Sequence, residues 1–413
     1  MHKYKISLST LIKYLIYLYI FILVTSVSTG TMPVKVIRVV LTAALVFYIL
    51  RSKAFKFNFY ITWAVVFLLY NVVMTQFASY KNYAVEYTAT LLYILIINIG
   101  VCFFMMKHDA MEGMIKAFIF STIVEAATTF GRNGLMVFLT ARRTDEGSAN
   151  TLGFYAAMAF ILSLILFRKF KGKNQRYIYG IACFLCAMIT LLSASRKAII
   201  YAVVPLVVYW IFSSKNPIKS FRNTIIALAA VVIGYCALMN IPFIYNLLGH
   251  RVQSMVAGFL GGATDASTST RLRLIEAGML WFRQKPWFGY GLANYSAMNW
   301  AIRGSIYYAH NNYVELLVDC GIVGTIIYYW LYINIILIAV KNKLMDRKVK
   351  VFIIGIVLSY IIGDYGMVSY NFAIFQLILM CLYVFALGRS TICEVESRPI
   401  QGTQMKMGDK KFI

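Results

Sequence analysis

Twelve long apolar stretches, separated mostly by short polar segments, set the strongest constraint on how this chain can fold. Each is about long enough to cross the roughly 30 Å hydrocarbon core of a bilayer as a helix. Hydrophobic residues make up 61% of the 413 residues and charged residues 13%, whereas about a quarter of the residues of a soluble domain are charged. Because backbone groups cannot stay unpaired in lipid, the stretches must be helices rather than open strands. We therefore expect an all-α integral membrane protein with about twelve transmembrane helices, near residues 9–29, 34–50, 59–77, 87–106, 114–130, 150–167, 177–193, 198–212, 223–240, 313–340, 349–366 and 370–388.

The distribution of lysine and arginine predicts the orientation in the membrane. Basic residues in short loops are retained on the cytoplasmic side. With the N-terminus inside, the seven inner segments hold 25 of the 40 basic residues, and the basic clusters recur at every second loop. We therefore expect a multi-pass protein of the cytoplasmic (inner) membrane with both termini in the cytoplasm. Most of the net charge of +25 then reflects topology, and no nucleic-acid partner is expected.

This orientation depends on the first apolar stretch. A basic start followed by an apolar run and small polar residues also resembles a signal peptide, and removal of such a peptide would invert every later helix. We interpret the run as a retained first helix.

The loops divide the chain unequally. Residues 1–240 form an N-terminal region of nine predicted helices, and residues 241–312 form a large extracytoplasmic loop between helices 9 and 10. Residues 313–390 add three more helices, and residues 391–413 form a cytoplasmic tail. Long loops in compact proteins are usually functional, so the large loop is a candidate for part of the site.

The large loop contains one helix-like run, from Arg271 to Gln284. It follows serine and threonine residues that are suited to helix capping, and Pro286 lies just beyond its end. A helical period places on one face Arg271, Ile275, Gly278 and Phe282. We expect an amphipathic helix that lies along the outer membrane surface.

The seven cysteines predict no metal or redox site. Nearly all of them lie inside apolar stretches. Cys183 and Cys186 have CxxC spacing, but they lie in the middle of an expected helix without histidine or further cysteine nearby. We assign the cysteines to helix packing and expect neither a metal nor any other cofactor.

Charged residues on the outer side are the main functional candidates, because ionisable groups at membrane depth are costly and are often functional. Arg196 and Lys197 separate two apolar stretches on that side, against the topological preference for basic residues. The alternative is a solvated turn with snorkelling side chains. The outer half holds 14 basic and nine acidic residues, so we expect an anionic partner there.

His310 and Asn311 stand where the polar loop ends and an apolar stretch begins. An ionisable ring is thus expected at the membrane surface, with no soluble domain around it. This placement indicates chemistry on a lipid-borne substrate.

Four motifs follow one another along the second half of the chain. They are Ser193-Ala-Ser-Arg-Lys, Ser269-Thr-Arg-Leu-Arg-Leu-Ile-Glu-Ala-Gly, Pro286-Trp-Phe-Gly-Tyr-Gly and Ala309-His-Asn-Asn-Tyr-Val-Glu-Leu-Leu-Val-Asp-Cys-Gly-Ile-Val-Gly. In this order, with a large outer loop between helices 9 and 10, they resemble the O-antigen ligase and polysaccharide polymerase family over nearly the whole length. The weaker stretch Asp145-Glu-Gly-Ser-Ala-Asn-Thr-Leu-Gly is similar to the start of a middle helix in that family. One departure is Ile275, which stands where the family often has tryptophan.

The resemblance implies transfer of a glycan from an undecaprenyl-diphosphate carrier to a hydroxyl of an acceptor, at the outer face of the cytoplasmic membrane. It implies catalytic roles for Arg196, Arg271 and His310. Guanidinium groups bind a diphosphate in bidentate fashion, so arginines could replace a metal. The imidazole could accept the proton of the attacking hydroxyl as a general base. We expect four further residues to bind substrate: Lys197, Arg273, Glu276 and Asn311.

Two carboxylates are alternative general bases. Glu276 and Glu315 both lie on expected helices, where pairing with an arginine is the more ordinary role. Direct attack at the anomeric carbon predicts inversion of configuration.

Within this reading, we prefer a polymerase that makes capsule, exopolysaccharide or O-antigen on a lipid-linked acceptor. A ligase that transfers the glycan to lipid A core, protein or wall polymer is the alternative. A flippase or transporter is disfavoured, because we find no repeat between the two halves, and a non-catalytic scaffold or sensor is the remaining class. The expected partners are the lipid-linked oligosaccharide, the glycan acceptor, the bilayer, and a flippase and chain-length regulator of the same pathway.

Overall fold

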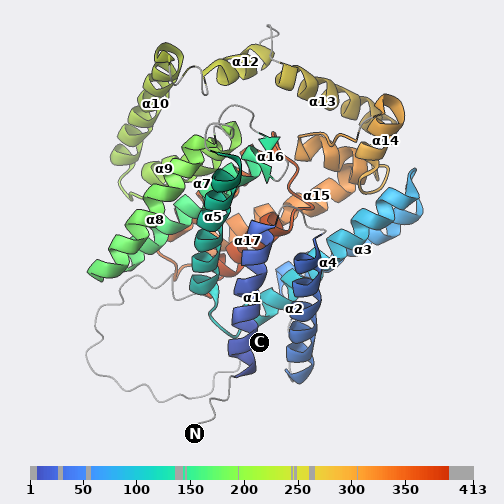
Figure 1. Cartoon of the computed structure of the whole chain (residues 1–413), viewed down its shortest axis with the longest axis horizontal. Coiled ribbons are helices and arrows are strands. Elements are labelled where there is room, and N and C mark those ends of the chain that lie inside the picture. The colour runs from blue at the N-terminus through green and yellow to red at the C-terminus, as the bar shows by residue number, and fades with distance from the viewer. Residues whose placement is uncertain are drawn as a thin grey trace.

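The structure is a computed structural model that describes residues 7–26, 31–52, 57–134, 143–144, 147–193, 195–242, 245, 249–259, 266–304 and 306–389. Over these ranges the chain is a bundle of helices with one very short antiparallel strand pair, β1 (Arg143–Thr144) and β2 (Gly147–Ser148) (Figure 1). The predicted all-helical architecture is confirmed. The predicted cytoplasmic tail lies outside the described residues.

The helices follow the order of the predicted apolar stretches. In the N-terminal region they are α1 (Leu8–Thr25), α2 (Met32–Arg51), α3 (Phe59–Gln76), α4 (Lys81–Met105), α5 (Met111–Asn133), α7 (Ala149–Lys169), α8 (Lys173–Leu192), α9 (Arg196–Phe212) and α10 (Pro217–Asn240). The later helices are α12 (His250–Phe259), α13 (Ala266–Gln284), α14 (Asn294–Arg303), α15 (Asn312–Lys341), α16 (Arg347–Asp364) and α17 (Ala373–Ala386).

Each of the twelve predicted stretches contains a helix, but the count of twelve spans is not confirmed. Among the described residues, nine helices are long and apolar enough to cross a membrane: α1 to α5, α7, α8, α10 and α15. Helix α9 has 17 residues and α17 has 14. Helix α16 has 18 residues but begins Arg-Lys-Val-Lys and ends on Asp364. The described chain is therefore a multi-pass membrane protein.

Polar side chains fix the starts of several helices. The oxygen atoms of Asn58, Asn216, Asn311 and Asp346 accept hydrogen bonds from backbone N–H groups in the first turn of α3, α10, α15 and α16, respectively. Such caps satisfy donors that have no partner inside the helix. Pro217, directly after one cap, suits the first helical position, which needs no N–H.

Helices α9 and α16 pack closely near their middles. A Cβ atom on Gly355 would lie 2.9 Å from Cα of Pro205, so these backbones approach closely because glycine leaves room. The rings of Phe154 and Phe375 stack with centroids 3.8 Å apart, and Tyr201 packs edge-on against Phe154. This buried aromatic cluster joins α7, α9 and α17.

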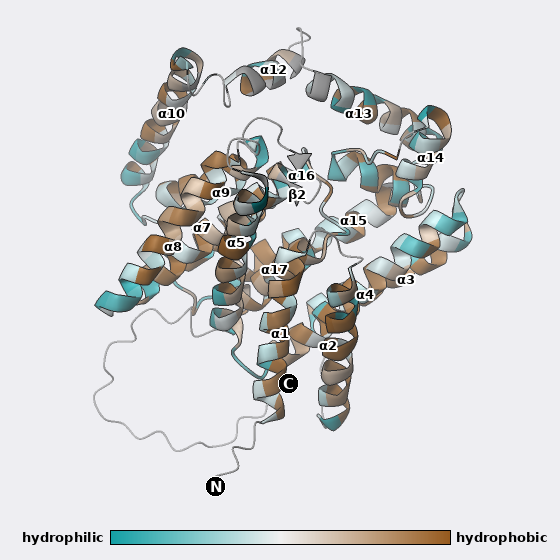
Figure 2. Ribbon diagram, viewed as in Figure 1, coloured by the Kyte–Doolittle hydropathy of each residue, from teal (hydrophilic) through white to brown (hydrophobic). Residues whose placement is uncertain are grey.

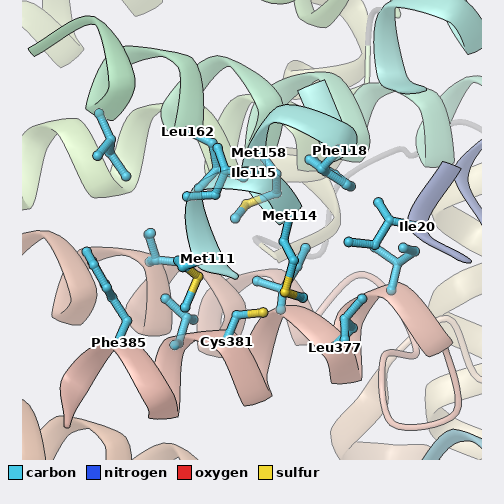
Figure 3. Close-up of a pocket in the computed structure, with 15 residues that line it drawn as sticks. Ile20, Met111, Met114, Ile115, Phe118, Met158, Leu162, Leu377, Cys381 and Phe385 are labelled. Atoms are coloured by element: carbon cyan, nitrogen blue, oxygen red, sulfur yellow. The ribbon is translucent and has the colours of Figure 1, made fainter. Parts of the chain in front are cut away.

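A cavity of about 660 Å³ lies deeper in the bundle, between α1, α5, α7, α16 and α17 (Figure 3). All of its lining side chains are aliphatic, aromatic, methionine or cysteine. Met158 and Leu162 of α7 face Leu377 and Cys381 of α17 across it. None of these lining side chains is charged, so this cavity does not suit a charged ligand.

The described part of the large loop predicted between α10 and α15 holds three α-helices. In Figure 1, α12, α13 and α14 form an arc across one end of the bundle. Figure 2 shows that α13 and α14 carry more hydrophilic surface than the brown helices of the bundle. The predicted helix of residues 271–284 lies within α13, which begins five residues earlier, at Ala266.

Candidate functional site

A break in α15 receives the Pro286-Trp-Phe-Gly-Tyr-Gly motif. Gly321 has φ 63° and ψ −171°, a backbone that interrupts the helix and that a side chain would strain. The carbonyls before the break and the N–H groups after it then pair with the motif. The four hydrogen bonds are Tyr290 N–H to Val318 O (2.9 Å), Gly291 N–H to Asp319 O (2.8 Å), Ile322 N–H to Pro286 O (2.8 Å) and Val323 N–H to Trp287 O (3.1 Å). Two of the sequence motifs are thus joined by backbone hydrogen bonds.

The carboxylate of Asp319 holds the next helix of the loop. This side chain is fully buried and accepts hydrogen bonds at 2.8 Å from the backbone N–H groups of Ala293 and Tyr295. These donors lie at the start of α14, where a negative charge is favourable. The end of the loop is therefore fixed to α15.

Helix α13 packs on the first turns of α15. A Cβ atom on Gly278 would overlap the side chain of Val314, and the Tyr295 hydroxyl donates to the Leu274 carbonyl at 2.7 Å. Arg271 lies seven residues before Gly278 and hence on the same face of the helix. The packing of α13 therefore turns Arg271 toward the bundle.

The Ser193-Ala-Ser-Arg-Lys motif forms the junction between α8 and α9. Ser195 precedes α9, and its hydroxyl donates to Oδ1 of Asn150 at 2.9 Å. Asn150 belongs to the weaker motif at the start of α7. Arg196 and Lys197 then form the first turn of α9, ahead of the apolar stretch 198–212, so their charges add to the positive end of the helix dipole.

These elements enclose a polar cavity of about 720 Å³, a volume that includes the part open to the outside. It lies between the starts of α9 and α13, the turn before α15 and the C-terminal end of α16. Its lining residues are Arg196, Lys197, Ile200, Thr268, Arg271, Leu272, Ile275, His310, Ile362, Gly363, Tyr365 and Gly366. None of these is acidic. The basic side chains among them suit an anionic ligand.

Lys197 is the most buried cation of this cavity, with 7% of its surface exposed. Burial, with the nearby positive charges of Arg271 and Arg196, lowers the pKa of its ammonium group from 10.5 to about 7. Within the described part of the chain, no carboxylate forms an ion pair with it. Three basic side chains, Arg196, Lys197 and Arg271, thus lie close together at this cavity.

His310 enters the cavity wall from a strained turn. Its φ is 53°, in the left-handed region that residues with a Cβ rarely adopt. The ring centroids of His310 and Tyr308 lie 4.0 Å apart. On the other side, Oδ1 of Asn311 accepts from the N–H groups of Tyr313 and Val314, at 3.0 and 3.2 Å. Asn311, expected to bind substrate, is thus buried as the cap of α15 and does not line the cavity.

The other predicted site residues are placed as follows. Arg196, Lys197, Arg271 and His310 come together around the cavity, whereas Arg273 and Glu276 are exposed on α13 and do not line it. Glu315 was expected to pair with an arginine, but within the described chain it forms no ion pair. Its carboxylate accepts a hydrogen bond from the N–H of Ala309 at 2.7 Å instead.

The sequence analysis did not predict that the end of α16 lines the cavity. Gly363, Tyr365 and Gly366 line the cavity, and between them Asp364 is fully buried. Its carboxylate accepts hydrogen bonds from Ser369, Tyr329 and Asn312, at 2.6, 2.9 and 3.2 Å. A single aspartate at the end of an apolar stretch gave only a weak signal of this network.

Comparison with known proteins supports the resemblance suggested by the motifs. No curated protein matches the chain. A family model described as O-antigen ligase matches residues 181–329. The matched segment begins in α8 and ends in α15, so it contains three of the four walls of the cavity, including Arg196, Arg271 and His310. Residues 181–329 are therefore similar to the O-antigen ligase family, and the predicted family resemblance is confirmed over this segment.

Proposed function

We propose that this protein is a polysaccharide polymerase that transfers a glycan from undecaprenyl diphosphate to a sugar hydroxyl of a lipid-linked acceptor, at the outer face of the cytoplasmic membrane. The observation that carries the proposal is that Arg196, Lys197, Arg271 and His310 line one cavity, whose described lining residues include no carboxylate. An anionic headgroup would neutralise these cations. The family match supports glycan transfer as the reaction class.

In the proposed reaction, the diphosphate of the donor lies between Arg196 and Arg271. The acceptor hydroxyl attacks the anomeric carbon, the bond from that carbon to the phosphate oxygen breaks, and undecaprenyl diphosphate leaves with the electron pair. Fixed guanidinium groups stabilise the charge that develops on the leaving oxygen. His310 accepts the proton of the hydroxyl. The configuration at the anomeric carbon inverts, because there is one displacement.

The donor set of the cavity suits a reaction that does not depend on a divalent metal. Magnesium prefers oxygen ligands, usually carboxylates, and among the described residues that line the cavity none has a carboxylate. Bidentate arginine pairs can neutralise a diphosphate directly. We therefore assign the role of the metal to Arg196 and Arg271.

Substitution of the cavity residues tests the proposal. R196A, R271A and H310A should each lower glycan assembly by on the order of 100-fold or more, because each removes charge stabilisation or proton transfer. R273A is the matched control, since Arg273 lies two residues from Arg271 but is exposed and outside the cavity. The proposal fails if the three cavity variants, present in the membrane at normal amounts, still assemble polymer.

The description of the matched family favours a ligase as the second candidate. The two enzymes differ in the acceptor, so a strain that lacks the chain distinguishes them. Single repeat units that accumulate on lipid indicate a polymerase. Complete polymer that stays on lipid without attachment indicates a ligase.

A further inference from the structure

Glu315 is a buried carboxylate one turn into α15 that does not line the cavity. Only 3% of its surface is exposed. Its Oε2 atom accepts a hydrogen bond of 2.7 Å from the backbone N–H of Ala309, which is itself fully buried. Burial of a carboxyl group is unfavourable unless it gains such partners. The position of Glu315 therefore needs an explanation beyond general packing.

The hydrogen bond from Ala309 acts on the residue directly before His310. His310 has a left-handed backbone, which is uncommon for residues with a Cβ, although histidine adopts it more readily than most. Such a conformation is held in place by its surroundings. On its far side, Asn311 is fixed by the capping bonds to the first turn of α15. On its near side, Glu315 holds Ala309. The strained residue thus lies between two fixed neighbours.

We infer that Glu315 is a positioning residue for His310: by binding the N–H of Ala309, it keeps the imidazole at the wall of the cavity that contains Arg196 and Arg271. The effect on catalysis rests on the proposed function, whereas the effect on the imidazole does not. Glu315 acts on the backbone and needs no contact with substrate. A glutamine at this position retains an acceptor oxygen, whereas a leucine of similar size retains none.

Asp319 provides a matched comparison. It lies one turn further along α15, is equally buried, and also accepts backbone N–H groups, but these belong to Ala293 and Tyr295 at the start of α14. Loss of either carboxylate should lower stability. Only the loss of Glu315 should alter the surroundings of His310.

The first measurement follows the imidazole itself. In purified protein, the rate of carbethoxylation of His310 by diethyl pyrocarbonate is measured by peptide mass spectrometry for the wild type, E315Q, E315L and D319L. We expect E315Q and D319L to stay within about twofold of the wild type. E315L should differ by roughly tenfold, since the left-handed turn relaxes. An unchanged rate in folded E315L, or a rate in E315Q that matches E315L, would overturn the inference.

The second measurement is glycan transfer, with the lipid-linked repeat unit extracted from a strain that lacks the chain as the probe. E315L should lower kcat by on the order of 100-fold with little change in KM for this donor, as misplacement of a catalytic group does. E315Q should restore kcat. In an H310A background, E315L should cost nothing further, because both changes remove the same group.

Two outcomes separate the inference from the proposed function. If E315L changes the reactivity of His310 while H310A still transfers glycan, positioning stands and the catalytic role of His310 fails. If E315L lowers transfer as much in H310A as in the wild type, Glu315 does not act through His310. Should E315L fail to accumulate, E315D replaces it, because it keeps the charge but withdraws the carboxylate by one methylene. E315D should then change the reactivity of His310 in the same direction.

Discussion

At the scale of single residues, Lys197 has the most unusual surroundings of the cavity. Burial disfavours its charged form, and the nearby charges of Arg271 and Arg196 disfavour it further. A bound anion would remove this penalty. A buried basic residue of this kind is more typical of a binding site than of a structural core.

The lowered pKa of Lys197 predicts how stability changes with pH. The ammonium group titrates near 7 in the folded protein and near 10.5 when unfolded. Between these values the unfolded chain binds the additional proton, so the free energy of unfolding rises with pH, by at most about 1.4 kcal/mol per pH unit. Thermal unfolding of the ligand-free protein in detergent at pH 6 to 9 measures this. K197M, which cannot titrate, should lack this part of the slope, and an identical slope in both proteins would contradict the assignment.

Anion binding should change with pH in the opposite direction. Lys197 loses its charge above about pH 7, so the wild type should bind inorganic pyrophosphate more weakly at pH 8.5 than K197R does. Arginine keeps its charge over this range. Titration calorimetry of both proteins at pH 6 and 8.5 measures the difference, and a constant ratio of the two affinities would exclude a role of the Lys197 proton in binding.

At the scale of elements, the site depends on places where regular helices stop. Backbone groups at the break at Gly321 pair with residues 286–291 of another motif, and the N–H before His310 pairs with Glu315 of the same motif. At the junction before α9, the Ser195 side chain donates to the Asn150 side chain at the start of α7. Buried backbone groups that lack such partners would be costly. The short motifs in the sequence therefore mark helix ends that fit together.

Substitution of Gly321 tests this dependence on a helix break. G321A should lower the free energy of unfolding by more than about 1 kcal/mol, because alanine is strained at positive φ and its Cβ would overlap the carbonyl of Trp287. The matched control is G234A in α10, where a Cβ would meet open space and alanine is the better helix former. Thermal unfolding in detergent compares them, and equal midpoints would argue against strain at residue 321.

At the scale of the whole molecule, the sequence was sufficient to predict the helical membrane fold and the meeting of Arg196, Arg271 and His310. Apolar length and the order of the motifs carry that information. The hydrogen bond of Glu315 to the backbone of Ala309 was not predicted, because the sequence pattern of α15 does not show the turn before it. The place of Gly366 at the cavity was not predicted either, because a single sequence does not record contacts between distant segments. Helices α9, α16 and α17 were also predicted to cross the membrane. Two of them are short and α16 carries charges at its ends, so nine helices among the described residues are long and apolar enough to do so.

The predicted orientation can be tested with the whole protein in cells. In a variant with Cys236 and Cys393 replaced by serine, R273C should react with a membrane-impermeant maleimide in intact cells. K343C, between α15 and α16, should react only after lysis, since the basic loops are expected inside. The opposite pattern would place the cavity in the cytoplasm and remove access to an outer-face donor.

The pairing of residues 286–291 with the break in α15 limits which segments can be exchanged with a related protein. Four main-chain bonds join the two segments, so a chimera that exchanges only the extramembrane loop would cut through a single folding unit. A graft whose boundaries enclose residues 286–323 keeps those bonds within one parent. The loop could then be moved into another chain only together with part of α15.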